Sequence, residues 1–333
     1  MNGGLPQLGL RFDLRAPDFG ARPDVLYGAA IDMAEWADRN GFQHVRISEH
    51  HGSADGYCPA PLAALAAFAA RTSRLRLRVS ALILPLHDPL RVAEELAVID
   101  IISKGRAEVV VAAGYRRREF DMFGADFAAR GAALEAGIAL LRRAWSGEPV
   151  EWRGRTVRVL PVPVQPGGLP IFVGGSSRTA ARRAARLGDG FMPTDPALYQ
   201  LYRQECVAAG RDPGPKPGPA GPFFLHVTDD PPRARAQLDR HVRHEIASYA
   251  EWTTGDQTGA DNTPQPVWAT GDQYAVLTPA EAVSLLRELG PSGALVLHPL
   301  VAGLDPRIAW ESLDLIAGKV LPALQAEGNH EPD

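Results

Sequence analysis

Short apolar or β-branched runs alternate with longer alanine-rich segments of helical period along most of the chain. This alternation is typical of repeated strand–helix units that build a parallel sheet. We predict eight strands, at residues 8–14, 43–48, 75–84, 106–113, 170–175, 189–193, 223–228 and 293–298. Eight such units make a (βα)8 TIM barrel, whereas a doubly wound open sheet carries a glycine-rich turn after its first strand, and no such turn follows Leu14.

Two of the intervening helices are marked at both ends. In the first, Asp24 is the predicted N-cap and Gly41 stands just past the end. In the second, Asp88 is the predicted N-cap, Pro89 occupies the first turn, and Gly105 closes the helix.

Two regions interrupt the alternation. Residues 148–166 predict a β-hairpin and a proline-rich connector, and residues 249–273 predict a long irregular loop of the kind that often covers a binding site. We therefore expect an α/β TIM barrel with a hairpin insertion between strands four and five and a long loop before strand eight. The expected domain covers residues 1–324, with a disordered tail at 325–333.

The composition of the chain argues against several classes of function. The chain has 333 residues and a formal net charge of −4, so it has no basic surplus for gripping a nucleic acid. Its two cysteines, Cys58 and Cys206, are far apart and in no metal-like spacing. With no signal-peptide pattern and no apolar run of spanning length, we expect a cytoplasmic protein without a membrane partner.

Histidines gather at the predicted ends of strands, which is the edge where TIM-barrel reaction sites form. They are His50, His51, His87, His226 and His298. Any one of them taken singly is more simply explained as a polar rim residue that hydrogen-bonds to the backbone. As a set, they favour a reaction site at this edge.

The adjacent pair in "SEHHG" suits proton transfer better than metal binding. Neighbouring residues in an extended chain point to opposite sides, so His50 and His51 are poorly arranged to bind one ion. A single imidazole that points inward can transfer protons near neutral pH, and Glu49 could orient it or its neighbour. We therefore predict no metal site.

A second candidate site lies in "IFVGGSSRTAARRAARLGDG", residues 171–190, where a strand leads into a helix. Bare backbone N–H groups, hydroxyls and a helix N-terminus together favour an anion, although glycine and serine are also ordinary helix-start residues. The residues concerned are Gly174, Gly175, Ser176, Ser177 and Thr179. The arginine run in "AAGYRRREFDMFG" is equally compatible with a solvated face and with one arginine reaching an anion.

Taken in order, these motifs resemble the bacterial luciferase-like flavin-dependent monooxygenases. The resemblance rests on "SEHHG", "LILPLHDPLRVAEELAVIDIISKGRAEVVVAAG", "EFDMFG", "ARGAALEAG" and "PIFVGGSSRTAARRAARLGDG", and runs from about residue 8 to residue 320. It implies a TIM barrel that binds reduced FMN at its carboxyl-terminal rim and uses it to activate O2. It also implies a separate flavin reductase and a small organic substrate, and we expect a homodimer.

Carried over residue by residue, the resemblance assigns proton transfer to His50, with His51 as its neighbour. Ser80 and Ala81 match the position of a non-proline cis peptide against the flavin ring. Gly114 and Tyr115, in the loop after strand four, are also expected to bind the cofactor, and Gly175, Ser176 and Thr179 match the positions that hold the flavin phosphate. This chain departs from the pattern at Ala113, where some members carry a phosphate-binding arginine, and Arg116, Arg117 or Arg118 could replace it.

Other functions stay open on the sequence alone. The same fold houses enzymes that use a deazaflavin coenzyme for hydride transfer without oxygen, and "EHH" favours FMN over that alternative. A flavin-binding protein without turnover is a further possibility. A metal-dependent TIM-barrel hydrolase using His50, His87, His226 and His298 ranks below these. Aromatic residues near the rim, Phe12, Tyr57, Tyr115, Trp252 and Trp268, suggest an apolar or aromatic substrate.

Overall fold

The computed structural model describes residues 5–254 and 273–328 of the chain. These residues form two compact units, each drawn from separated segments. The first unit comprises Met1–Val45, Ser53–Tyr57 and Pro217–Asp333, and the second comprises Arg46–Gly52 and Cys58–Lys216. Strand β2 (His44–Ile47) lies where the chain passes from one unit to the other.

The first unit contains two pairs of parallel strands, β1 with β11 and β9 with β10. Gly9 lies opposite Val296 in the first pair, and Val276 lies opposite His226 in the second. Its elements are β1 (Gln7–Phe12), α1 (Pro23–Arg39), β9 (Phe224–Val227), α8 (Pro231–Thr254), β10 (Tyr274–Leu277), α9 (Pro279–Leu289), β11 (Ala294–Leu297), the 3-10 turn η3 (Val301–Gly303), α10 (Pro306–Leu315), the π-helical turn η4 (Ile316–Val320) and α11 (Leu321–Gly328).

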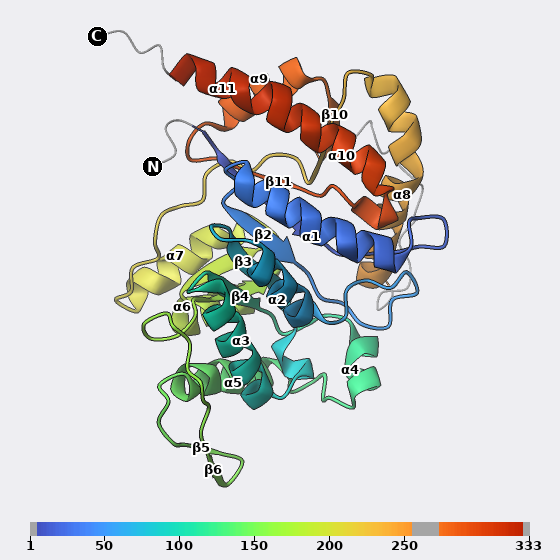
Figure 1. The fold of residues 1–333 in the computed structure, drawn as a ribbon. Coiled ribbons are helices and arrows are strands. Elements are labelled where there is room, and N and C mark those ends of the chain that lie inside the picture. Colours follow the sequence, from blue (N-terminus) through green and yellow to red (C-terminus); the bar gives the residue numbers. More distant parts are fainter. Residues whose placement is uncertain (1–4, 255–272, 329–333) are drawn as a thin grey trace, which may run out of the picture. The chain divides into compact units, whose positions relative to one another are not determined.

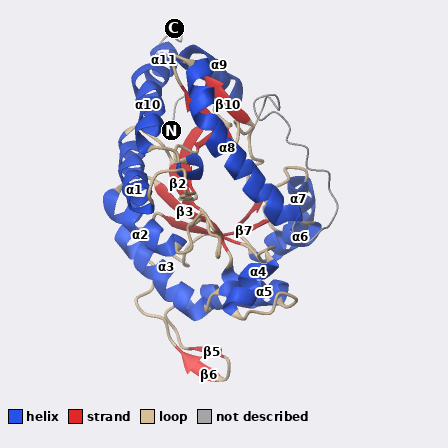
Figure 2. Ribbon diagram, turned by 90° about the vertical axis from the view of Figure 1, so that its right-hand side faces the viewer, coloured by secondary structure: helices blue, strands red, loops and turns tan. Residues whose placement is uncertain are grey.

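The second unit contains four parallel strands in the order β3-β4-β7-β8, with helices packed outside them (Figures 1 and 2). All five residues of β4 are buried, as expected for a strand covered on both faces. The elements are α2 (Pro61–Arg71), β3 (Arg76–Leu82), η1 (Leu84–Leu86), α3 (Pro89–Ser103), β4 (Ala107–Val111), α4 (Arg117–Phe123), α5 (Arg130–Ala144), β5 (Val150–Trp152), β6 (Arg155–Val157), β7 (Ile171–Gly175), α6 (Arg178–Leu187), β8 (Gly190–Pro193) and α7 (Leu198–Ala208).

The alternation of strands and helices confirms the predicted α/β class, and each of the eight predicted strands is present. One further strand, β10, was not predicted because its four residues follow a long polar stretch. Strand β1 ends at Phe12 rather than Leu14, since Leu14 has a φ of 56° that breaks the extended chain. Helix α11 continues past residue 324, where we expected the domain to end.

Helix punctuation was predicted correctly for α3 and in part for α1. The Asp88 side chain accepts a hydrogen bond from the Leu90 N–H, which confirms it as the N-cap of α3. Asp24 is not an N-cap: α1 begins at Pro23, so Asp24 lies inside its first turn. The reason is that proline favours the first helical position, so the helix starts at Pro23, two residues earlier than an N-cap at Asp24 would give.

The predicted interruptions have different outcomes. Strands β5 and β6 form an antiparallel hairpin between α5 and β7, and Figure 1 shows it extending away from the helices of the second unit. The predicted loop at 249–273 is wrong at its beginning, because residues 249–254 continue α8 as helix. Residues 255–272, including Trp268, lie outside the described residues.

A cluster of buried charges holds the carboxyl ends of β1 and β11 to α8 in the first unit. The His298 imidazole has its Nδ1 atom 3.2 Å from Glu245 and its Nε2 atom 3.4 Å from Asp13. Arg11 donates a hydrogen bond of 3.1 Å to the same Glu245 carboxylate. All of these groups except Arg11 are fully buried, so each charge depends on its partners to offset the cost of desolvation.

The Arg15 guanidinium extends this cluster and is fully buried. It donates to Asp55 at 2.5 Å and lies 4.5 to 5.0 Å from the ring centres of Tyr57, Tyr249 and Trp252. Cation–π contacts of this kind stabilise a desolvated guanidinium. Two of the aromatic side chains that the sequence suggested for a substrate pocket, Tyr57 and Trp252, therefore pack against Arg15.

Both cysteines, Cys58 and Cys206, are buried free thiols. Among the described helices, none is both long and apolar enough to cross a membrane.

The buried position of His298 predicts a pH dependence of stability. Burial alone would lower its pKa, but the nearby Asp13 and Glu245 carboxylates outweigh burial and the charge of Arg11, and raise it. The protonated imidazole therefore stabilises the fold fully below the unfolded pKa of about 6.5, and this contribution is lost as the pH rises through the folded pKa. We expect the urea midpoint to fall over that alkaline range.

The variant His298→Gln should lose about 3–5 kcal/mol of stability, as expected when a buried ion pair loses one partner, and should show a smaller alkaline decline than wild type. His226→Gln is the matched control, because burial lowers the pKa of His226 to about 4, which is below the pH range over which His298 loses its proton. An alkaline decline of equal size in His298→Gln and wild type would contradict the assignment.

Candidate active site

The carboxyl ends of β2, β3, β4 and β7 bring most of the predicted site residues into one unit. His50 and His51 follow β2, Ser80 and Ala81 lie in β3, Gly114 and Tyr115 follow β4, and residues 174–179 run from the end of β7 into α6. By contrast, His226 in β9 and His298 after β11 belong to the first unit. The histidines considered for a hydrolase are thus divided between the two units.

His50 is held by a carboxylate that the sequence analysis did not assign. Its Nδ1 atom lies 2.8 Å from the Oε1 atom of Glu119, at the start of α4. Both side chains are buried. Because a carboxylate accepts the hydrogen bond, the neutral imidazole carries its proton on Nδ1 and presents Nε2 as the basic nitrogen.

Three donors converge on the Oε1 atom of Glu119. The His51 backbone N–H donates at 3.0 Å and Arg116 donates at 3.0 Å, in addition to His50. Burial raises the pKa of Glu119, but these hydrogen bonds and the charge of Arg116 outweigh it and lower the pKa overall. Glu119 therefore stays ionised near neutral pH. Arg116 serves this carboxylate, which argues against it as the replacement for a phosphate contact at Ala113.

Tyr115 lies beside the basic nitrogen of His50. Its hydroxyl is 3.5 Å from His50 Nε2, and the two rings meet edge to face with centres 5.7 Å apart. The preceding Gly114 has a φ of 78°, and a Cβ there would come within 2.8 Å of both Ile83 and Phe120. Only glycine allows the chain to turn at this point and present Tyr115 to the imidazole.

His51 faces a different carboxylate, that of Glu49. One oxygen of Glu49 accepts hydrogen bonds from His51 Nε2 at 2.9 Å and from His87 Nε2 at 2.6 Å, and the other accepts from the Ile83 N–H at 2.5 Å. Burial raises the pKa of Glu49, but the hydrogen bonds from His51 and His87 and the charge on His87 lower it overall, to about 2. The sequence had left open whether Glu49 orients His50 or its neighbour, and it orients His51.

The group formed by Glu49, His51 and His87 has metal-ligating atoms but the geometry of a hydrogen-bond network. Ligands on a tetrahedral ion with bonds of 2.0–2.1 Å lie about 3.3 Å apart. The two contacts to Glu49, at 2.9 and 2.6 Å, are too short for that arrangement and suit direct N–H···O bonds. The similar group of Asp13, Glu245 and His298 has Arg11 and Arg15 beside it, whose charges oppose a cation.

The predicted cis peptide is present between Ser80 and Ala81. A Cβ placed on Gly174 would lie 3.8 Å from the Ala81 Cβ and 3.1 Å from a methyl of Val110, so the ends of β3, β4 and β7 meet here. The glycine keeps the backbone close to both neighbours.

The start of α6 has the features expected of an anion site. Gly175 has a φ of 150°, and a Cβ there would lie 2.7 Å from the Ala180 Cβ. Ser176, Ser177 and Thr179 are exposed, and the Ser177 hydroxyl caps the helix by accepting from the Ala180 N–H. The backbone N–H groups and hydroxyls of this turn fit a phosphate group, which favours the cofactor role predicted for these residues.

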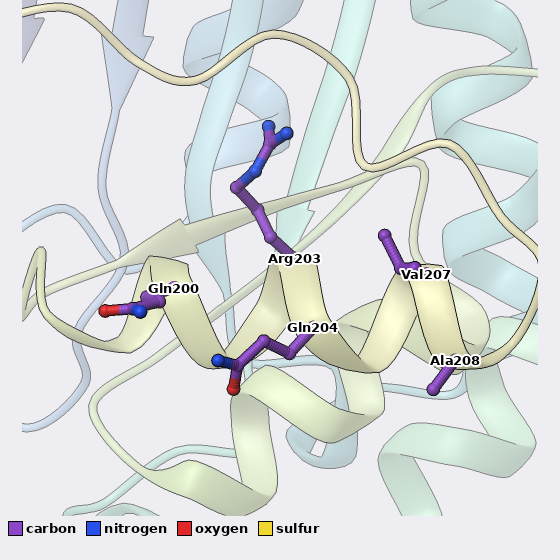
Figure 3. Close-up of a pocket in the computed structure, with 5 residues that line it drawn as sticks. All are labelled: Gln200, Arg203, Gln204, Val207 and Ala208. Carbon is purple, nitrogen blue, oxygen red and sulfur yellow. The ribbon is translucent and has the colours of Figure 1, made fainter.

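A surface depression in the second unit lies over α7 alone, where Figure 3 shows Gln200, Arg203, Gln204, Val207 and Ala208. A single helix supplies every side chain, and Arg203 donates to the Gly214 carbonyl. The depression brings no acid and base together, and we do not assign it to catalysis.

The chain is similar to known proteins over most of its length. Residues 17–283 match the family model of luciferase-like monooxygenases. The F420-dependent glucose-6-phosphate dehydrogenase of Nocardia farcinica is 30% identical over 336 residues, covering 97% of this chain and 90% of that protein.

Two solved structures share the fold. Monooxygenase RslO1 from Streptomyces bottropensis is 25% identical with a TM-score of 0.78, covering 95% of this chain and 99% of that one. The oxygenating constituent of 3,6-diketocamphane monooxygenase from Pseudomonas putida, solved in complex with FMN, is 20% identical with a TM-score of 0.70, covering 96% and 98%. The family match extends over most of the chain, and the chain belongs to the luciferase-like monooxygenase family.

Proposed function

We propose that the protein is a monooxygenase that uses reduced FMN and O2 to oxygenate a small apolar or aromatic organic molecule. The observation that carries the proposal is the buried His50–Glu119 pair, in the same unit as the cis peptide at Ser80–Ala81 and the anion-type turn at α6. The likeness to RslO1, at 25% identity and a TM-score of 0.78, supports oxygenation. The proposed architecture is a complete (βα)8 barrel.

The residues of this chain would hold FMN by its phosphate and one face of its ring. The start of α6, from Gly175 to Thr179, would receive the phosphate, and the Ser80–Ala81 segment would lie against the ring. When bound, reduced FMN supplies the electrons that activate O2, so that one oxygen atom reaches the substrate and the other leaves as water.

His50 would accept and return a proton through Nε2 during this chemistry. Glu119 keeps the Nδ1 proton in place and stabilises the imidazolium whenever Nε2 takes up a proton. The Tyr115 hydroxyl, 3.5 Å from Nε2, provides a polar neighbour through which a proton can pass. Glu119 therefore plays the part that an orienting carboxylate plays in other histidine-based sites.

The partners follow from the proposed chemistry. The sequence carries no nicotinamide-binding glycine fingerprint, so we propose that a separate flavin reductase supplies reduced FMN. The aromatic rings at the two histidines, Tyr115 beside His50 and Phe123 beside His51, suit a substrate with an apolar or aromatic body.

A second candidate function is hydride transfer with coenzyme F420 and without oxygen. The observation that favours it is the 30% identity to the dehydrogenase of Nocardia farcinica over nearly the whole chain. The same His50–Glu119 pair would serve a proton-coupled oxidation of an alcohol, since His50 Nε2 is placed to accept the hydroxyl proton.

Cofactor titration separates the two functions. We expect reduced FMN to bind under anaerobic conditions more tightly than reduced F420, because the turn at Gly175–Thr179 suits a terminal phosphate. On admission of O2, substrate should change the rate at which the bound flavin is reoxidised. Tight binding of oxidised F420, with its reduction by the substrate in the absence of O2, would instead establish the dehydrogenase function.

Replacing His50 tests the proton-transfer role. His50→Asn should lower kcat by about 10²- to 10⁴-fold, the usual contribution of a general acid or base, with little change in cofactor affinity. Glu119→Gln should shift the pH profile of kcat, since the imidazole would lose the negative charge beside Nδ1. His241→Asn is the control, because His241 belongs to the first unit and contacts the Ala302 carbonyl. Wild-type kcat and pH profile in both site variants would refute the role.

A further inference from the structure

We infer that Glu49 and His87 form a positioning pair for the cofactor pocket, and that His51 belongs to this pair rather than to the proton-transfer group. The inference rests on the proposed function, because it concerns the same pocket. It divides the two adjacent histidines into different tasks: His50 moves a proton, and His51 helps to hold the walls of the pocket.

The Glu49 carboxylate connects the ends of two neighbouring strands. It follows β2, and it accepts the Ile83 N–H two residues beyond Ala81 in β3. Its other oxygen accepts from His51 and from His87, which stands just before the start of α3. A fully buried carboxylate with three donors has its geometry fixed from three directions, so it can set the position of the β3 end.

Packing of apolar side chains links the position of Ile83 to that of the Glu119 carboxylate. Ile83 packs with Leu86 and Phe120 in a buried apolar cluster, and Phe120 directly follows Glu119 in α4. Ile83 also lies against Gly114, where an added Cβ would come within 2.8 Å of it. A shift of Ile83 would therefore move both the Ser80–Ala81 wall and the support of the His50–Glu119 pair.

Both the imidazole ring and the backbone of His51 make contacts that hold it in this arrangement. Its Nε2 atom donates to Glu49, and its ring meets Phe123 edge to face with centres 4.7 Å apart. Its backbone N–H donates to Glu119, so it ties the two carboxylates together. An Nε2 atom that donates to a permanently ionised carboxylate is not placed to act as a base toward a substrate.

His87 connects the buried pair with the surface. Its side chain is 25% exposed and lines a groove of about 430 Å³ between α2 and α3. The titratable and charged groups around it are the Glu49 carboxylate and the His51 ring, whose centre lies 6.2 Å from that of His87, and the residues of α3 that line the same groove, Arg91, Glu94 and Glu95. Burial lowers its pKa, but Glu49 and the charge of Glu95 outweigh this and raise it. Protons from solvent can therefore reach His87, which supports the wall of the cofactor pocket through its hydrogen bond to Glu49.

The test compares His87→Gln with wild type in cofactor-free and cofactor-loaded protein. Loss of a charge-assisted hydrogen bond should weaken FMN binding about tenfold or more, with a much smaller effect on kcat at saturating cofactor. In cofactor-free protein, amide hydrogen exchange of the segment at residues 80–86 should accelerate. The pH dependence of FMN affinity across the His87 titration should flatten in the variant.

Matched variants isolate the effect. Glu94→Gln lies in the same groove and pairs with the exposed Arg91, so it should leave FMN affinity and exchange of residues 80–86 at wild-type values. Glu49→Gln should weaken FMN binding and accelerate exchange of residues 80–86 more strongly than His87→Gln does. If Glu49→Gln does not fold, the comparison of His87→Gln with wild type tests the positioning pair by itself. His51→Asn should weaken FMN binding more than it lowers kcat, which is the reverse of His50→Asn.

Unchanged FMN affinity and unchanged exchange in His87→Gln would overturn the positioning pair. A loss of kcat in His51→Asn equal to that in His50→Asn, with FMN affinity intact, would overturn the division of the histidines. If the wild-type protein binds neither FMN nor F420, the proposed function fails, whereas the exchange measurement on cofactor-free protein still decides the role of Glu49 and His87.

Discussion

The hydrogen bond between His50 and the buried Glu119 carboxylate is the interaction on which the candidate site depends. It holds the proton of the neutral imidazole on Nδ1, and Nε2 is then the basic nitrogen that is available to a substrate. The carboxylate can do this only while ionised, and the converging donors from Arg116 and the His51 backbone keep it so despite burial. The surrounding structure, from the Gly114 turn to the packing of Phe120, serves to hold this pair in place.

The second carboxylate, Glu49, explains why two histidines stand together. Side chains of adjacent residues in an extended segment point apart, so a carboxylate on each side is needed to hold both. Glu119 takes His50, and Glu49 takes His51 together with His87. The first histidine remains available for chemistry through Nε2, while the second links the ends of β2 and β3.

Much of this architecture could be predicted from the sequence, because it depends on local patterns. Apolar runs such as residues 107–111 predicted buried strands, and Asp88 with Pro89 predicted a helix start. The role of Glu119 could not be predicted, since an acidic residue directly after three arginines looks like part of a solvated face. Its burial depends on the turn at Gly114 and the packing of Phe120 against Ile83, which are long-range contacts. Strand β10 was missed for a related reason: its partner β9 lies about fifty residues earlier in the chain.

The orientation of His50 by Glu119 is tested most directly by the protonation pattern of the histidine rings, measured by nitrogen-15 NMR in cofactor-free protein at a pH where the imidazoles are neutral. Spectra of His50→Asn and His51→Asn assign the two signals. We predict that His50 carries its proton on Nδ1 and that His51 carries its proton on Nε2. A His50 signal with the proton on Nε2 would contradict it, because Glu119 would then not be orienting the ring toward the reaction.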